Sequence, residues 1–232
     1  MQYLYLYLNI GSFLVPFLFS FHPKLQFYKK WKSLFLGIAV MMAIFIPWDV
    51  AFTEAGIWGF NDAYITGYKI FGLPIEEWLF FICIPYACLF THYALQTIFP
   101  KLSFSERTTS IIYVSLVAIL VITLWYTYDR WYTLVNLGYT IILLGLVYNY
   151  KKALLRTFLP TFIIILIPFF IVNGVLTGSG IEDPVVWYND AENLGVRLWT
   201  VPIEDSMYAL SMLLTVFVIM EKAQEKSRTL ES

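Results

Sequence analysis

The sequence predicts an all-α integral membrane protein with about seven transmembrane helices, arranged as two parallel three-helix repeats joined by a connector helix. Three observations lead to this prediction: the composition, seven apolar stretches of helix length and a motif that occurs twice. Hydrophobic residues make up 59% of the 232 residues, and charged residues only 13%. Soluble domains carry about 25% charged residues, so this chain has too little polar surface to cover itself in water. With a net charge of −1 it is not expected to bind nucleic acid.

Seven apolar stretches match, or nearly match, the length of a membrane-crossing helix. A hydrocarbon core about 30 Å thick requires about 20 helical residues, and helices satisfy their backbone hydrogen bonds internally. None of the stretches shows the strict alternation of a barrel strand. The second stretch is short, so we expect its helix to extend a little at one end. In order, the stretches are Tyr3–Phe21, Ser33–Trp48, Pro74–Leu95, Ser110–Tyr128, Trp131–Tyr150, Leu155–Leu176 and Pro202–Met220.

The basic residues predict how the chain is oriented in the membrane. Every Lys and Arg except Lys69, Arg130 and Arg197 falls in alternate loops or in the C-terminal tail, which all lie on one predicted side. Cytoplasmic loops carry an excess of Lys and Arg. We therefore expect a multi-pass protein of a bacterial inner membrane, with its N-terminus outside and its C-terminus in the cytoplasm.

A repeated motif relates the two halves of the chain. The pattern Asp/Asn-x-x-x-Thr-x-x-Gly-Ile occurs at 49–57 and at 173–181, and each copy precedes a polar loop that contains a Trp and an Asn. Each loop ends in Pro-Ile-Glu and a further acidic residue, at 74–77 and 202–205. A single connecting helix gives both repeats the same direction across the membrane. The predicted units are the first repeat at 1–100, the connector helix at 101–130, and the second repeat with a cytoplasmic tail at 131–232.

Four carboxyl groups stand in the repeated motif, at Glu76, Glu77, Glu204 and Asp205. They have a structural explanation, because acidic residues in a first helical turn pair with free backbone N–H groups and with the helix dipole. They also have a functional one, because ionisable groups in membrane helices mark functional sites. Burial in a dry cavity, or a second carboxyl group nearby, keeps a carboxyl group protonated against the effect of the dipole. Such a group can protonate a weak base such as an alkene.

In these motifs the chain resembles the flavin-independent lycopene cyclases. The resemblance rests on Pro-Ile-Glu-Glu-Trp-Leu-Phe-Phe at 74–81, Pro-Ile-Glu-Asp at 202–205 and the Asp/Asn-x-x-x-Thr patterns, and it extends to Met220. In that family two small homologous membrane units, separate or fused as here, form one enzyme. The resemblance implies an isomerase that closes the linear ends of lycopene into β-ionone rings, giving γ-carotene and β-carotene without net redox change. By the same resemblance, four acids are expected to be essential: Glu76, Glu77, Glu204 and Asp205.

The resemblance also implies a lipid-soluble carotenoid, lycopene, as the substrate, and no cofactor. The sequence has no Gly-x-Gly-x-x-Gly motif for flavin or nicotinamide binding. It has no Asp-rich motif for magnesium diphosphate, and its last apolar stretch has no Lys for a retinal Schiff base. No metal is expected. Beyond substrate and bilayer, other carotenoid-pathway enzymes and further copies of the chain stay open as partners.

Two other functions stay open at this point. Relatives of this kind also cyclise longer, C50 carotenoids or form ε and γ ends, so neither the substrate length nor the ring isomer is fixed. A protein of a different class, a non-enzymatic carrier or proton-coupled transporter for an apolar ligand, also fits internal repeats with acids at the outer end. The acids, however, cluster at one membrane face instead of following a path across it.

Residues near the acids are predicted to surround the substrate. Asp49 and Asn173 hold equivalent places in the motif, and we expect them either to hydrogen-bond the carboxyl groups or to satisfy loop backbone groups. Aromatic faces stabilise cations, although Trp and Tyr also gather at membrane interfaces without such a role. The aromatic candidates are Trp58, Trp78, Trp187 and Tyr208, with Trp48 and Trp199 also near the motif ends.

Overall fold

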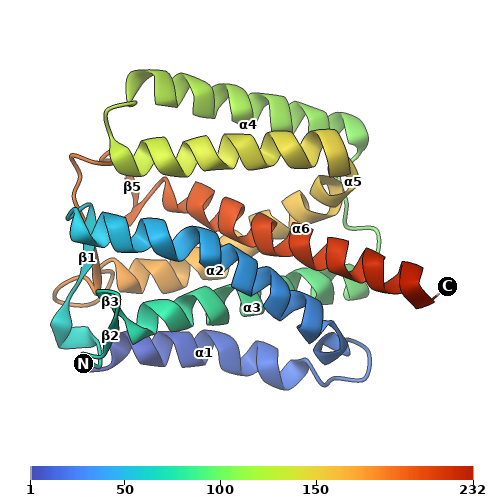
Figure 1. Ribbon diagram of the computed structural model, residues 1–232, viewed down its shortest axis with the longest axis horizontal. Coiled ribbons are helices and arrows are strands. Elements are labelled where there is room, and N and C mark those ends of the chain that lie inside the picture. Colours follow the sequence, from blue (N-terminus) through green and yellow to red (C-terminus); the bar gives the residue numbers. More distant parts are fainter. Residues whose placement is uncertain (1, 232) are drawn as a thin grey trace.

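The computed structural model describes residues 2–231, which form a bundle of α-helices with three small sheets at one end (Figure 1). Two 3-10 turns, Phe27–Lys30 and Asp62–Tyr64, lie in the loops. The helices are α1 (Leu4–Phe19), α2 (Trp31–Glu54), α3 (Ile75–Ile98), α4 (Glu106–Tyr126), α5 (Trp131–Leu176) and α6 (Asp205–Glu231).

The helices confirm the prediction of an all-α membrane protein. Within residues 2–231, five helical segments are long and apolar enough to cross a bilayer, and α1 is a shorter apolar helix of 16 residues. The second predicted stretch is extended in α2 at both ends, not at one. Its C-terminal end continues past Trp48 to Glu54, and in this extension Asp49 Oδ1 and the Thr53 hydroxyl oxygen both accept a hydrogen bond from the indole of Trp58.

The predicted fifth and sixth stretches both lie in α5, so the count of seven helices is not confirmed. At about 1.5 Å per residue, the 46 residues of α5 would be more than twice as long as a bilayer core is thick. The helix is interrupted at Lys151, which has non-helical backbone angles, and the ribbon turns back there (Figure 1). Accordingly Tyr132, near the start of α5, and Asn173, near its end, line the same cavity.

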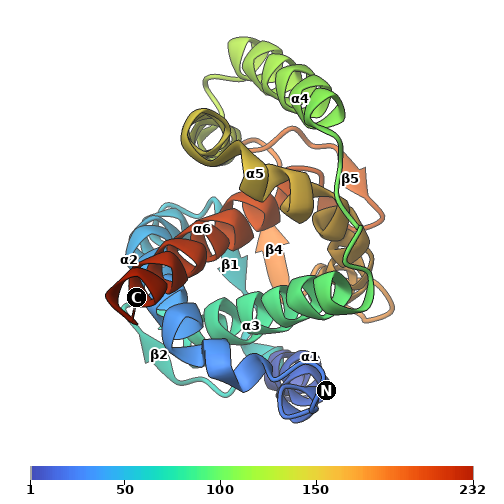
Figure 2. The same cartoon turned by 90° about the vertical axis from the view of Figure 1, so that its right-hand side faces the viewer.

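The helices pack so that each half contributes to a common core. Helix α1 packs on α3, α2 on α6, and α5 on α4, α3 and α6. The α2–α6 contact is very close, because a Cβ atom on Gly37 would lie 2.7 Å from the carbonyl oxygen of Val216. Helix α4 lies on the outside against α5 (Figure 2), and its apolar side chains, such as Val114 and Ile122, are exposed as expected in lipid.

Three antiparallel two-stranded sheets cover one end of the bundle. Two are hairpins that lead into the acidic motifs: β2 (Lys69–Ile70) with β3 (Leu73–Pro74), and β5 (Arg197–Leu198) with β6 (Val201–Pro202). The third joins the two halves of the chain, because β1 (Trp58–Phe60) pairs with β4 (Val186–Tyr188). In that pair Gly59 lies directly under the ring of Trp187, where no side chain would fit.

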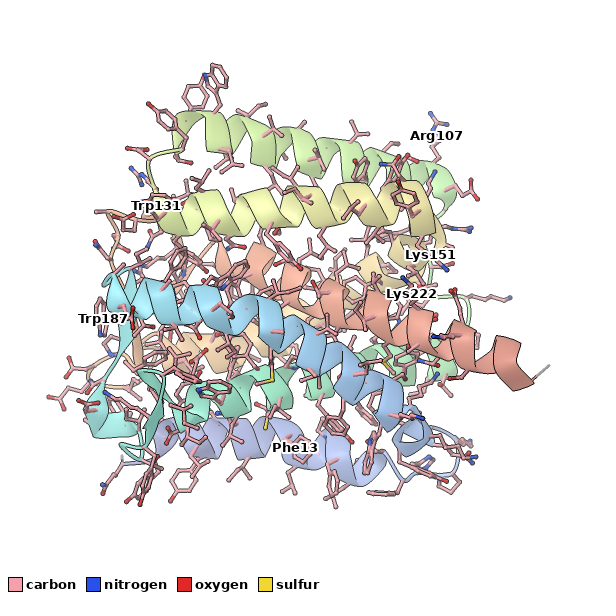
Figure 3. All side chains as sticks on the ribbon, viewed as in Figure 1. Phe13, Arg107, Trp131, Lys151, Trp187 and Lys222 are labelled. Carbon is pink, nitrogen blue, oxygen red and sulfur yellow. The ribbon has the colours of Figure 1, made fainter. Side chains whose placement is uncertain are left out.

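Three labelled basic side chains lie at the opposite end of the bundle. Figure 3 shows Arg107, Lys151 and Lys222 at this end and Trp131 and Trp187 at the sheet end. The structure thus gathers these three basic residues from different segments of the chain at one end.

Candidate active site

A small cavity of about 50 Å³ lies at the sheet end of the bundle, between strands β1 and β4 and the ends of five helices. Three carboxyl groups line it, those of Asp49, Glu77 and Asp205. The described lining includes Asn173 and Thr177 but no Lys, Arg or His. The remaining wall is largely aromatic: Tyr5, Trp58, Phe60, Phe80, Tyr132, Phe169, Tyr188 and Tyr208.

Glu77 is held by a tyrosine from the first helix. It lies in the first turn of α3 and is 9% exposed. The hydroxyl of Tyr5, which is itself buried, donates a hydrogen bond of 2.5 Å to Glu77 Oε2. Among the described residues, no hydrogen bond to Glu77 Oε1 is formed, so this oxygen is available to a ligand in the cavity.

Asp205 is held in the corresponding way in the second half. It is the first residue of α6, and the hydroxyl of Tyr132 at the start of α5 donates to its Oδ1. The hydroxyl of Tyr188 in β4 donates to its Oδ2 at 3.1 Å. Burial, with the nearby Asp205 carboxylate as a further cause, raises the pKa of Tyr188 well above its ordinary value, so its phenol remains a donor.

Glu76 and Glu204, the other two acids of the motif, do not line this cavity. Glu76 is fully buried and its Oε1 accepts a 2.7 Å hydrogen bond from the backbone N–H of Thr66. Glu204 accepts in the same way from the backbone N–H of Leu194, at 2.6 Å, and from the hydroxyl of Thr133, at 2.9 Å. These two carboxyl groups therefore attach the loops at the sheet end to the helices that carry Glu77 and Asp205.

Two asparagines fix the first turns of these helices. Asn9 in α1 donates a 2.8 Å hydrogen bond to the carbonyl oxygen of Glu76, and Asn136 in α5 donates one of 2.8 Å to that of Glu204. Since Tyr5 and Asn9 contact neighbouring residues of α3, they lock the position of the Glu77 backbone and side chain together.

Asp49 and Asn173 both line the cavity but have different surroundings. Oδ1 of Asp49 accepts a 2.8 Å hydrogen bond from Trp58, while its Oδ2 is buried without a partner among the described residues. Asn173 donates to the carbonyl oxygen of Phe169 in its own helix, at 3.1 Å. The expected hydrogen bonds from these two residues to the motif carboxyl groups are therefore not among those that the structure forms.

The aromatic candidates divide into two groups. Trp58 and Tyr208 line the cavity. Trp78 lies beside the first hairpin, where its indole donates to the carbonyl oxygen of Ile70 at 3.3 Å, and Trp187 is 41% exposed on the outer face. The structure thus places only the first two next to the carboxyl groups.

The tyrosines that hold the carboxyl groups were missed by sequence reasoning. Tyr5 and Tyr132 lie 72 and 73 positions from the acids they contact, whereas Tyr188 lies 17 positions before Asp205. A signal for two of them exists, because Tyr-x-x-x-Asn occurs at 5–9 and again at 132–136, near the start of the first helix of each predicted repeat. Within residues 2–231, no group of three His, Cys, Asp or Glu side chains is placed to hold a metal ion.

Comparison with known proteins gives one match. The family model described as lycopene cyclase matches residues 2–95 and 129–223, which together cover most of the chain and include both acidic motifs. No curated protein and no solved structure matches.

Proposed function

Because the chain belongs to the lycopene cyclase family, we propose that it closes the linear ends of lycopene into β-ionone rings by acid catalysis in the cavity at the sheet end. The observation that carries this proposal is the group of three carboxyl side chains, Asp49, Glu77 and Asp205, on a wall that is otherwise largely aromatic. This combination supplies proton donors and acceptors next to surfaces that stabilise a cation.

The reaction needs one proton to be added and one to be removed. A carboxyl group donates its proton to the terminal double bond of the substrate, which leaves a tertiary cation. The neighbouring double bond attacks this cation, so a six-membered ring closes and the charge moves to a ring carbon. A carboxylate then removes an adjacent proton, and the choice of proton sets the ring isomer. Substrate and product have the same formula, so the balance requires no oxidant or reductant, and we expect activity without a flavin or nicotinamide.

The hydrogen bonds suggest how the carboxyl groups divide the work. Both oxygens of Asp205 accept from tyrosine hydroxyls, which suits a carboxylate, since a carboxylate only accepts. Asp49 has an unpartnered Oδ2 that can carry the proton to be donated. Glu77 leaves Oε1 available to the substrate. Glu76 and Glu204 then act as positioning residues through Thr66 and Leu194.

The aromatic wall supports the cationic steps. Trp58 has its indole N–H committed to Asp49 and Thr53, so its ring is fixed in place. A fixed aromatic face stabilises a desolvated cation by about 0.5–2 kcal/mol without trapping it as a covalent product. Tyr208 packs on Trp58 with ring centroids 6.3 Å apart and extends the same wall.

The membrane setting fits a substrate that never enters water. We propose that the sheet end faces away from the cytoplasm, because the basic end should lie in the cytoplasm under the positive-inside rule. The N-terminus would then lie outside and the C-terminus inside, and lycopene would reach the site from the bilayer.

Pigment analysis of bacteria that accumulate lycopene tests this function. Expression of the chain should replace lycopene by monocyclic and bicyclic carotenes, and the chromatogram identifies the ring isomer. If lycopene stayed linear while the protein was present in the membrane, the experiment would be repeated with a linear C50 carotenoid. Cyclisation of that carotenoid would indicate a different substrate. No cyclisation would refute the cyclase proposal and favour a carrier or transporter.

A further inference from the structure

A second, larger hollow lies next to the acidic cavity. It has a volume of about 380 Å³ and is formed by α1, α3 and the second part of α5. Its wall is mainly apolar and includes Leu8, Gly11, Ala87, Ile165 and Pro168. Along α1 the lining runs from Tyr7 to Pro16, which is about 14 Å of helix at 1.5 Å per residue. We call this hollow the α1–α3–α5 groove.

The groove borders the acidic cavity and reaches the bilayer. Phe169 and Asn173 line both spaces, so these two side chains separate the groove from the carboxyl groups. Tyr7 and Gly11, at its rim, are exposed on the outer face of α1. In a membrane that face meets lipid, and a hydrocarbon can therefore enter the groove without crossing water.

The volumes assign different parts of a substrate to the two spaces. A cavity of about 150 Å³ is known to bind benzene, so the acidic cavity, at about 50 Å³, is too small for a substituted six-membered ring. The groove is large enough. The end of the carotenoid that reacts must therefore occupy part of the groove as well as the acidic cavity. Phe169 lies between these two spaces and would have to move.

We propose that the α1–α3–α5 groove binds the polyene chain of the carotenoid and delivers its end past Phe169 to the carboxyl groups. This inference rests on the proposed cyclase function. The ligand class follows from the wall, since a linear hydrocarbon has no polar group to satisfy and needs only apolar contact. Asn173, which is bonded to its own helix, marks the point where the apolar groove meets the polar cavity.

At the position equivalent to the groove in the second half, aromatic side chains pack against one another. Tyr132 and Asn136 in α5 make the same contacts as Tyr5 and Asn9 in α1, which aligns the two helical segments. In this alignment Gly138 corresponds to Gly11, and Tyr139 corresponds to Ser12. The shared motif likewise places Trp48 opposite Val172.

Aromatic rings occupy that equivalent position. The rings of Tyr139 and Trp48 lie 5.6 Å apart, Phe45 lies 5.5 Å from Tyr139, and the Tyr139 hydroxyl is 2.8 Å from that of Thr215. We therefore expect the polyene to lie in the α1–α3–α5 groove and not at the equivalent position of the second half, so that the two ends of a linear carotenoid enter this groove in turn.

Two matched glycine substitutions test the groove. A Cβ atom built on either Gly11 or Gly138 meets nothing within 4 Å, so neither substitution clashes at its first side-chain atom. Gly11→Phe places a ring in the groove, whereas Gly138→Phe places the same ring at the equivalent point of the other half. In lycopene-accumulating cells, Gly11→Phe should lower ring formation by about tenfold or more, since occupied apolar pockets discriminate on this scale. Gly138→Phe should match the unsubstituted chain. Equal conversion of lycopene by Gly11→Phe, Gly138→Phe and the unsubstituted chain, at equal amounts of protein in the membrane, would overturn the groove proposal.

A binding measurement separates this proposal from the proposed function. Each glycine variant is combined with Glu77→Gln and purified from lycopene-containing membranes, and the bound pigment is read from its absorbance. Pigment should remain with Gly138→Phe and be lost with Gly11→Phe. If the unsubstituted chain bound lycopene in the groove but never cyclised it, the proposed cyclase function would be refuted and the groove proposal would be retained. Pigment retained equally by both variants would refute the groove even if the chain were a cyclase.

Discussion

Tyr5 and Glu77 are 72 positions apart in the chain, yet the tyrosine hydroxyl donates a 2.5 Å hydrogen bond to the carboxyl group. Tyr132 donates to Asp205 in the same way. Each carboxyl group in the cavity that comes from an acidic motif is thus oriented by a phenol from the first helix of its own half. Through these hydrogen bonds the two phenols fix the carboxyl groups at which we propose that the reaction takes place.

Loss of these phenols should impair turnover more than substrate binding. A hydrogen bond to a charged group contributes about 1.5–3 kcal/mol, so Tyr5→Phe and Tyr132→Phe should each lower kcat by about tenfold or more. KM should change little, because neither hydroxyl lines the α1–α3–α5 groove. Tyr113→Phe is the control, since Tyr113 stacks on Tyr148 at the α4–α5 contact. A rise in KM with unchanged kcat would contradict the orienting role.

The two neighbouring acids of the first motif should respond differently to substitution. Glu76→Gln keeps an oxygen that can accept from Thr66 and should retain most activity, whereas Glu77→Gln should abolish it. Glu76→Leu should lower the free energy of unfolding by about 1–3 kcal/mol, because it leaves the Thr66 N–H unpaired. Thermal unfolding in detergent and pigment analysis of the same preparations measure both effects. Equal inactivation by Glu76→Gln and Glu77→Gln would show that Glu76 takes part in the chemistry.

The sequence predicted the class of fold well because composition and apolar stretches respond directly to the bilayer. The interruption of α5 at Lys151 falls in the predicted break between Tyr150 and Leu155, but the sequence did not predict that so short a turn would join the two helical segments. The recognised family is confirmed by the match to both acidic motifs. The predicted division into two repeats and a connector is not itself tested, although the hydrogen bonds of Asn9 and Asn136 recur in the two halves.

The site was predicted only as a set of motif residues. The pattern Pro-Ile-Glu-acid indicates four carboxyl groups, and because adjacent residues on a helix point about 100° apart, one acid of each pair is expected to cap or hydrogen-bond while the other faces the bundle interior. Glu77 and Asp205 therefore reach the cavity while Glu76 and Glu204 meet the loops, a difference that depends on how α3 and α6 are rotated in the bundle. The pattern Tyr-x-x-x-Asn marks Tyr5 and Tyr132 as equivalent, but which carboxyl group each hydroxyl contacts depends on packing between distant segments.

Asp49 should be needed for proton donation. In Asp49→Asn the amide oxygen can still accept from the Trp58 indole, so the fold should be kept while the ionisable oxygen is lost. General acid catalysis contributes about 10²–10⁴-fold, and a fall of at least about 100-fold in ring formation is expected. Asp62→Asn serves as the control, because the Asp62 side chain is 78% exposed in a surface ion pair with Lys69. Unchanged conversion by Asp49→Asn would remove Asp49 from the reaction.

The sheet that joins the two halves should be sensitive to a single methyl group. In Gly59→Ala the new Cβ would lie 2.3 Å from the Trp187 ring, so either the ring would have to move away from β1 or the two strands would have to separate. Overpacking of this kind costs about 1–3 kcal/mol, and a lower thermal midpoint is expected. Trp187→Leu combined with Gly59→Ala should recover part of the loss. If the double variant were no more stable than Gly59→Ala alone, the steric explanation would be wrong.

Deuterium labelling follows the proton that we propose the carboxyl groups of this chain deliver to the substrate. The purified protein in lipid vesicles is incubated with lycopene in heavy water, and the mass of the product is measured by mass spectrometry. Carboxyl protons exchange with solvent, so each ring formed should carry a single deuterium at the carbon that was protonated, and Glu77→Gln should form no labelled product. Rings that form without deuterium would contradict acid catalysis by these side chains.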